Sequence, residues 1–68
     1  QLDNKERAAI LFKAMQKLPG NQRIAFTLIK VEGLRYEAVS DIMNLSIKAV
    51  EALMHRAKEN LKKHLKHY

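Results

Sequence analysis

Residues 34–65 read LRYEAVSDIMNLSIKAVEALMHRAKENLKKHL, and this stretch decides the fold. Its apolar spacing predicts a short helix over about 36–43, a tight turn at 44–46 and a long helix over about 47–66. Two helices joined in this way have the layout of a helix-turn-helix, whose second helix enters the major groove of DNA. The residues that come before this stretch are expected to support it.

The composition predicts an all-α fold, a small four-helix domain in which all 68 residues form one unit. Hydrophobic residues make up 47% of the chain, and there are only two Gly and one Pro. A domain of this size buries roughly 60% of its unfolded surface, so its stability depends on one well-packed core. The chain has no cysteine, so neither a disulfide nor a cysteine-ligated zinc supports that core.

The chain opens on Gln1 rather than on Met, and we therefore expect it to be a fragment of a longer protein. No apolar run approaches the roughly 20 residues that span a bilayer, and no signal-peptide pattern is present. We expect a cytoplasmic location and no membrane partner.

The positive charge is concentrated towards the C-terminus. The formal net charge is +6; residues 1–20 contribute 4 − 2 = +2, residues 21–45 contribute 3 − 3 = 0, and residues 46–68 contribute 6 − 2 = +4. An excess of positive charge beside the turn favours a polyanionic partner such as nucleic acid. A basic face that is merely solvated gives the same pattern.

The first helix is predicted over about residues 4–18. Asp3 and Glu6 have the spacing of a capping box at its start. Ile10 lies off the apolar stripe, and we expect it to be exposed or to contact a partner. The stripe itself is formed by Ala8, Leu11, Phe12, Met15 and Leu18.

The second helix is predicted over about residues 22–32. Pro19-Gly20 breaks the chain before it, Asn21 is expected to cap it, and Gly33 is expected to end it. Apolar residues surround nearly the whole helix. That pattern is typical of a buried central helix or of one that lends a face to a partner.

In the helix-turn-helix, the capping residues differ in quality. Arg35 is a poor N-cap for the short helix, whereas Ser46 is a good one for the long helix. Asn44 tolerates the left-handed conformation that a tight turn needs. The side chains of the short helix that we expect to point inward are Val39, Ile42 and Met43.

The long helix is amphipathic. Its inner seam is predicted to contain Ile47, Val50, Met54, Ala57, Leu61 and Leu65. The opposite face carries Lys48, Ala52, His55, Glu59 and Lys62, flanked by Glu51, Arg56, Lys63 and Lys66. Such a helix also suits a membrane surface or an acidic protein. However, the apolar seam is narrow, and we expect the other three helices to pack against it, which argues against a membrane contact.

Residue types that carry catalysis are sparse, so we expect a binding module that is not an enzyme and has no cofactor. There is no Gly-rich phosphate loop, and Ser40 and Ser46 are accounted for by helix and turn positions. His64 and His67 are three residues apart near the C-terminus, where solvated histidines are expected rather than a metal site.

The long helix has the parts that DNA binding requires. Its N-terminus at Ser46 suits a phosphate, and Lys48, Ala52 and His55 share the spacing by which a recognition helix reaches base edges. Glu51 is expected either to accept a hydrogen bond from cytosine N4 or to pair with His55. The side chains expected to meet phosphates are Arg56, Lys58, Lys62 and Lys63.

Several segments together resemble region 4 of bacterial sigma-70 factors, in particular those of the extracytoplasmic-function (ECF) group. The resemblance covers roughly residues 14–65 in one ordered series. The segments are Leu18-Pro19, Gln22-Arg23, Val31-Glu32-Gly33-Leu34, Tyr36-Glu37-Ala38-Val39, Leu45-Ser46-Ile47 with Val50, and His55-Arg56-Ala57-Lys58.

The resemblance implies a domain that recognises the −35 promoter element in transcription initiation. It implies double-stranded promoter DNA, the flap of the RNA polymerase β subunit and an anti-sigma factor as partners, and a separate promoter-melting domain that these 68 residues lack. When the DNA contacts of the family are transferred to the matching positions of this sequence, Arg23 and Arg35 are expected near the DNA backbone. By the same correspondence, the residues on or beside the side of the helix that faces the bases are Ser46, Lys48, Ala49, Glu51, Ala52, His55 and Arg56.

Two alternatives remain open at this stage. One is a LuxR-type helix-turn-helix regulator whose effector domain is absent from these residues. The other is a sigma-like protein-interaction domain with weakened DNA contact, because Glu51, Ala52 and Leu53 stand where the family commonly has Lys, Ser and Arg.

Overall fold

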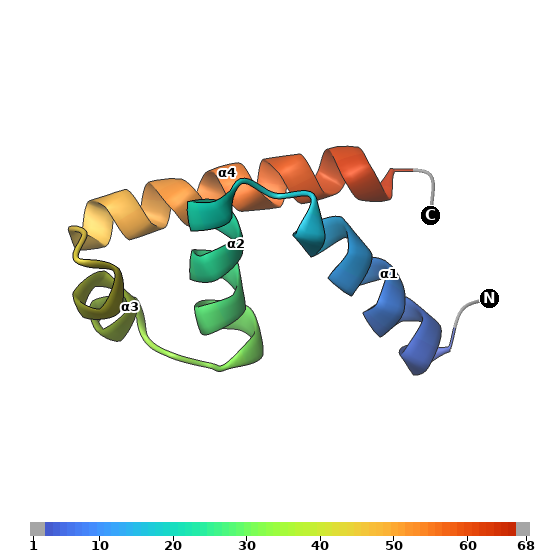
Figure 1. Ribbon diagram of the computed structural model, residues 1–68, viewed down its shortest axis with the longest axis horizontal. Helices are drawn as coiled ribbons and strands as arrows, with labels where there is room; N and C mark the ends of the chain where they lie inside the picture. The colour runs from blue at the N-terminus through green and yellow to red at the C-terminus, as the bar shows by residue number, and fades with distance from the viewer. Residues whose placement is uncertain (1–2, 67–68) are drawn as a thin grey trace.

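The computed structural model describes residues 3–66, which form helices packed against one long helix (Figure 1). In chain order the elements are α1 (Asn4–Gln16), α2 (Gly20–Phe26), the π-helix η1 (Thr27–Val31), α3 (Tyr36–Met43) and α4 (Ile47–Leu65). Helix η1 continues α2, so the two together form the second of the four expected helices. The described residues contain no strand, and the predicted all-α fold is confirmed.

The core lies along the inner face of α4. In Figure 1 this helix runs across the top of the molecule, and the other helices lie below it. Val50 and Ala57 are 0% exposed and Met54 is 1% exposed, as the predicted seam requires. The main buried cluster joins α1, α2 and α4 and consists of Ala14, Met15, Leu18, Ala25, Phe26, Met54, Ala57 and Leu61.

The predicted apolar stripe of the first helix is only partly buried: Met15 and Leu18 lie in the core, but other positions of the stripe do not. Phe12 is 62% exposed and Ala8 is exposed, whereas Ile10 is half-buried. The cause is the course of α1, which packs on α4 through its C-terminal part and diverges from α2 towards its N-terminus (Figure 1). Two residues of the stripe, Ala8 and Phe12, are therefore left exposed.

Ile42 and Ile47, which flank the turn, were also predicted to point inward. They are 61% and 42% exposed respectively. The short helix buries Val39 fully instead, and among residues 3–66 no element covers the outer side of the turn. The helix-turn-helix therefore packs through fewer apolar positions than its sequence offers.

The second helix begins earlier than predicted and changes its winding. It starts at Gly20, with Pro19 at the N-cap and no side-chain cap, so Asn21 lies inside the helix. The carbonyl of Pro19 accepts the Arg23 N–H at 3.0 Å and makes the first helical bond. The π-helical turn of η1 contains the β-branched residues Thr27, Ile29 and Val31, which crowd the preceding turn of an α-helix.

The turns have the predicted geometry. Gly33 ends η1 at φ +76°, and the Leu34 N–H donates to the Leu28 carbonyl at 3.0 Å. Asn44 adopts the left-handed conformation at φ 56° and ψ 47°. The Leu45 N–H donates to the Ser40 carbonyl at 2.9 Å, which closes the turn that orients α4 relative to α3.

Candidate nucleic-acid interface

The N-terminus of α4 is organised by Ser46. The Ser46 hydroxyl accepts the Ala49 N–H at 3.0 Å, and its carbonyl accepts the Val50 N–H at 3.1 Å. The N–H groups of Ile47 and Lys48 have no acceptor within the helix, because the first turn lacks preceding carbonyls. They point outward from an exposed helix end that carries partial positive charge, which suits a phosphate oxygen.

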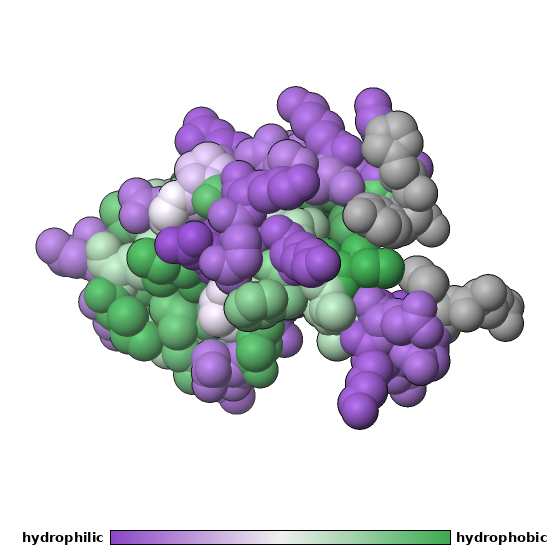
Figure 2. All heavy atoms as spheres, turned by 45° about the vertical axis from the view of Figure 1, so that its right-hand side comes forward, coloured by the Kyte–Doolittle hydropathy of each residue, from purple (hydrophilic) through white to green (hydrophobic). Residues whose placement is uncertain are grey.

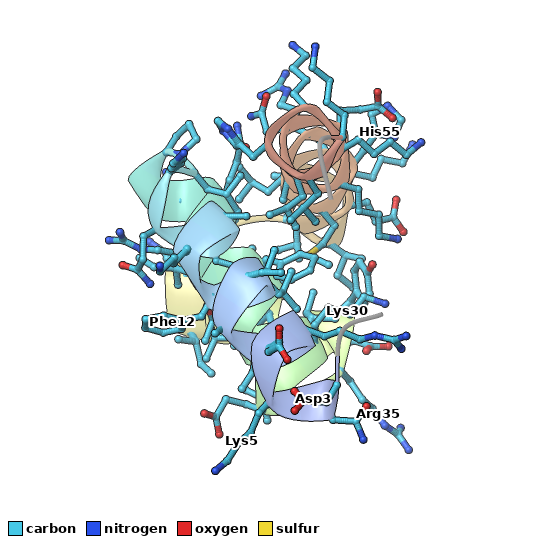
Figure 3. All side chains as sticks on the ribbon, turned by 90° about the vertical axis from the view of Figure 1, so that its right-hand side faces the viewer. Asp3, Lys5, Phe12, Lys30, Arg35 and His55 are labelled. Atoms are coloured by element: carbon cyan, nitrogen blue, oxygen red, sulfur yellow. The ribbon has the colours of Figure 1, made fainter. Side chains whose placement is uncertain are left out.

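The edge of α4 that follows this end is open to solvent. Lys48, Glu51, Ala52 and His55 are exposed, and Ala49 is half-buried beside them. Figure 3 shows His55 directed away from the helices. We call the residues Lys48, Ala49, Glu51, Ala52 and His55 the reading edge. Apart from Ala49, its side chains are exposed, as insertion into a groove requires.

Exposed cations flank the reading edge. Arg56 and Lys58 are exposed on α4. Arg35 precedes α3, forms no side-chain cap there, and lies on the same side of the molecule as His55 in Figure 3. In that view Arg35 lies near the lower end of the molecule and His55 near the upper end, so the structure does not bring Arg35 to the reading edge.

Arg23 lies elsewhere. It is half-buried on α2, where it lines a groove facing α1 together with Phe12. Figure 3 shows Phe12 on the opposite side from Arg35 and His55. The fold therefore brings neither Arg23 nor Arg35 to the reading edge.

Few ion pairs neutralise the basic surface. Within residues 3–66, the one ion pair shorter than 4.0 Å joins Lys62 to Glu59 at 3.6 Å, and both side chains are well exposed. The expected pairing of Glu51 with His55 is not formed in this part of the chain. The carboxylate of Glu51 thus remains a free hydrogen-bond acceptor on the reading edge.

The groove between α1 and α2 is a feature that sequence reasoning missed. It has a volume of about 500 Å³, and its exposed apolar side chains include Phe12, Ile24 and Val31. Figure 2 shows apolar side chains gathered at the lower left, below the hydrophilic surface that α4 contributes to. The sequence did contain an indication of this groove. Apolar residues surround nearly the whole second helix, so more of its apolar surface is available than the core can bury.

Metal binding and membrane insertion find no support in the described residues. Between residues 3 and 66, no three His, Cys, Asp or Glu side chains come together to hold an ion. His64 is half-buried on α4, and His67 lies outside the described residues. Over the same range, no helix is both long enough and apolar enough to cross a bilayer.

Comparison with known proteins agrees with the geometry. Residues 8–61 match the family "Sigma-70, region 4". The chain belongs to this family. The resemblance seen in the sequence is thereby confirmed, and so is its closeness to the ECF group, because the curated relatives are ECF sigma factors.

The region 4 chain is 34% identical over 56 residues to the ECF RNA polymerase sigma-E factor of Escherichia coli K12, covering 82% of this chain and 29% of that protein. The same identity and coverage hold for the sigma-E factor of Salmonella typhi. The sigma-E factor of Haemophilus influenzae is 35% identical over 54 residues, covering 79% of this chain and 29% of the relative. The chain thus spans about 29% of the length of these relatives. No solved structure matches it at a comparable level of significance.

Proposed function

We propose that this chain is the −35 promoter-recognition domain of an ECF-type sigma factor, which positions RNA polymerase for transcription initiation. The observation that carries the proposal is the Ser46-capped start of α4, followed by a solvent-exposed reading edge in a region 4 domain. The LuxR-type alternative gains no support from the matched family. A domain with this role works in the cytoplasm and needs no membrane partner.

In this proposal the contacts divide into two classes. The side chains of Lys48, Ala52 and His55 meet base edges, with Glu51 as an acceptor for cytosine N4. Arg35, Arg56 and Lys58 meet phosphates on either side and fix the orientation of the helix. The free N–H groups at the Ser46 end bind a further phosphate.

Duplex binding tests this division. Fluorescence anisotropy at low salt should show Lys48→Glu weakening duplex binding, whereas Lys5→Glu, with the same charge change on exposed α1, should not. Selection from a random duplex pool should enrich a short motif, and His55→Ala should relax the preference at one position of it. If Lys48→Glu and Lys5→Glu behave alike, α4 is not the DNA-binding element.

We further propose that the α1–α2 groove receives the flap of the RNA polymerase β subunit. An apolar surface of this kind on a small domain is typical of a protein interface, and Phe12 points away from the side that carries His55. An anti-sigma factor is a further proposed partner, which would act by covering these surfaces.

Matched substitutions test the polymerase contact. Phe12 and Val31 are each 62% exposed within the groove, and Ile42 is 61% exposed outside it. Phe12→Ser and Val31→Ser should reduce retention on an immobilised β-flap fragment, whereas Ile42→Ser should not. Equal losses for all three variants would contradict the assignment of the groove. If flap retention is preserved and duplex binding is absent at low salt, the chain is instead a protein-interaction domain.

A further inference from the structure

Arg23 has no part in the contacts proposed so far. It is half-buried on α2 and lines the α1–α2 groove, away from the reading edge. Among residues 3–66, no carboxylate forms an ion pair with its guanidinium. None of the side-chain hydrogen bonds formed in this range involves it either. A partly desolvated cation without a counterion, in an otherwise apolar groove, suits an anionic ligand.

The groove has a polar end and an apolar remainder. Gln16 is the last residue of α1 and Arg23 is the fourth residue of α2, and residues 17–19 connect the two helices. Both side chains line the groove, at the end where the helices are joined. From there α1 and α2 diverge (Figure 1), and the lining along them is apolar apart from Thr27. Among the described residues that form the lining, Arg23 alone is charged.

We propose that the α1–α2 groove binds a medium-chain alkyl carboxylate. The carboxylate lies at the polar end, where the guanidinium of Arg23 donates two parallel hydrogen bonds to it and the amide of Gln16 donates a third. The alkyl chain extends along the groove against Ile24 and Leu28 from the second helix and Phe12 from α1. The volume of about 500 Å³ lies within the range of pockets that bind small molecules.

The length of the groove selects an alkyl chain of medium length. Ala8 and Gln16 are eight residues apart on α1 (16 − 8 = 8), so the lining extends about 12 Å along this helix. Phe12 and Val31 are each 62% exposed, which leaves apolar area for an alkyl chain to remove from water. Each methylene that the groove covers should strengthen binding by about fourfold, and methylenes beyond its open end should add little.

An alkyl carboxylate would also compete with the β flap for this groove. Its chain covers the groove that contains Phe12 and Val31, the two side chains through which the flap contact is tested above. This regulatory consequence rests on the proposed function of the groove. Binding of the carboxylate itself depends on neither the flap nor DNA, so the two proposals can fail separately.

Calorimetric titration of the chain with octanoate tests the site. Octanol has the same alkyl chain without the charge and is the matched ligand; each is used below the concentration at which it aggregates. We expect octanoate to bind at least about tenfold more tightly than octanol, because hydrogen bonds to charged groups contribute at least this factor. From hexanoate through octanoate to decanoate, the affinity should rise by about fourfold for each methylene that the groove covers.

Matched substitutions locate the carboxylate. Arg23→Gln removes the charge in the groove, and Arg35→Gln removes an exposed charge that lies opposite Phe12 in Figure 3. The first variant should weaken octanoate binding by at least about tenfold and change octanol binding by less than about twofold, which also shows that the groove keeps its shape. The second should change both affinities by less than about twofold, because salt screens an exposed, distant charge. In two-dimensional NMR spectra, octanoate should shift the amides of Arg23, Ile24 and Leu28.

Three results would overturn the proposal: equal affinity for octanoate and octanol, equal effects of the two arginine variants on octanoate binding, or amide shifts confined to α4. The second result would mean that the net charge of the chain, rather than the groove, attracts the carboxylate. Failure of the flap proposal has a different signature. In that case octanoate binds as expected, but neither octanoate nor Phe12→Ser lowers retention of the chain on the immobilised β-flap fragment.

Discussion

The salt dependence of duplex binding is the sharpest quantitative consequence of the structure. The exposed cations among the proposed DNA contacts are Arg35, Lys48, Arg56 and Lys58. If each neutralises one phosphate, counterion release gives a slope of log K against log salt of about −3.6, because each contact contributes about −0.9. Affinity should then fall by roughly 150-fold between 50 and 200 mM salt.

Arg56→Ala tests the number of phosphate contacts, because it removes one of them without altering the core. Arg56 is exposed on α4, so the variant should fold normally. Its slope should be about −2.7, which corresponds to a loss of roughly 40-fold over the same salt range. The assay is fluorescence anisotropy of a labelled duplex, titrated with protein at a series of salt concentrations.

The matched control is Lys5→Ala, which removes one exposed cation from α1, a helix that carries no proposed DNA contact. Its slope should equal that of the unmodified chain. The reasoning is refuted if Arg56→Ala leaves the slope unchanged, or if Lys5→Ala lowers it by the same amount. In the second case the whole net charge, rather than a defined face, would be binding the duplex.

The remaining predictions concern the turn, the core and the reading edge. Ser46→Ala removes the cap of α4 and should cost about 1 kcal/mol, which lowers the midpoint of thermal unfolding, followed by circular dichroism, by roughly 4–8 °C. Asn44→Ala forces a left-handed residue to carry an unfavourable Cβ and should cost about 1–2 kcal/mol, whereas Asn44→Gly should retain stability under the same thermal scan. Met54→Ala should cost about 2–5 kcal/mol in urea unfolding because Met54 is 1% exposed, and Lys63→Ala on the outer face should change little. Glu51→Lys should raise non-specific duplex affinity at low salt and steepen the salt slope by about 0.9, which a direct anisotropy comparison would detect.

The features that sequence predicted correctly are governed by local chemistry. Ser46 caps α4 and Asn44 takes the left-handed position because each requirement is met by the residue itself and its immediate neighbours. Gly33 ends the second helix for the same reason. The burial of Val50, Met54 and other inner residues of α4 was also predictable, since α4 has helices along most of its inner side.

The features that sequence could not predict depend on how far neighbouring helices extend. Periodicity identified the apolar side of α1, but the exposure of Phe12 and Ala8 follows from the divergence of α1 from α2. Ile42 is exposed because nothing covers the outer side of the turn. A groove lined by Lys30, Leu61 and Lys62 joins η1 to the C-terminal half of α4, and no local pattern connects these residues.

The departures from the family pattern at positions 51–53 have different consequences in the structure. Leu53 is half-buried and packs against the main core cluster, so a leucine in place of arginine adds to the packing of α4. Glu51 and Ala52 are exposed on the reading edge. If these departures weaken DNA contact, the proposed effect is therefore confined to Glu51 and Ala52, while the capped helix start and the flanking cations are retained. That combination favours a domain whose orientation on DNA is fixed by phosphates and whose sequence preference is set by Lys48, Glu51 and His55.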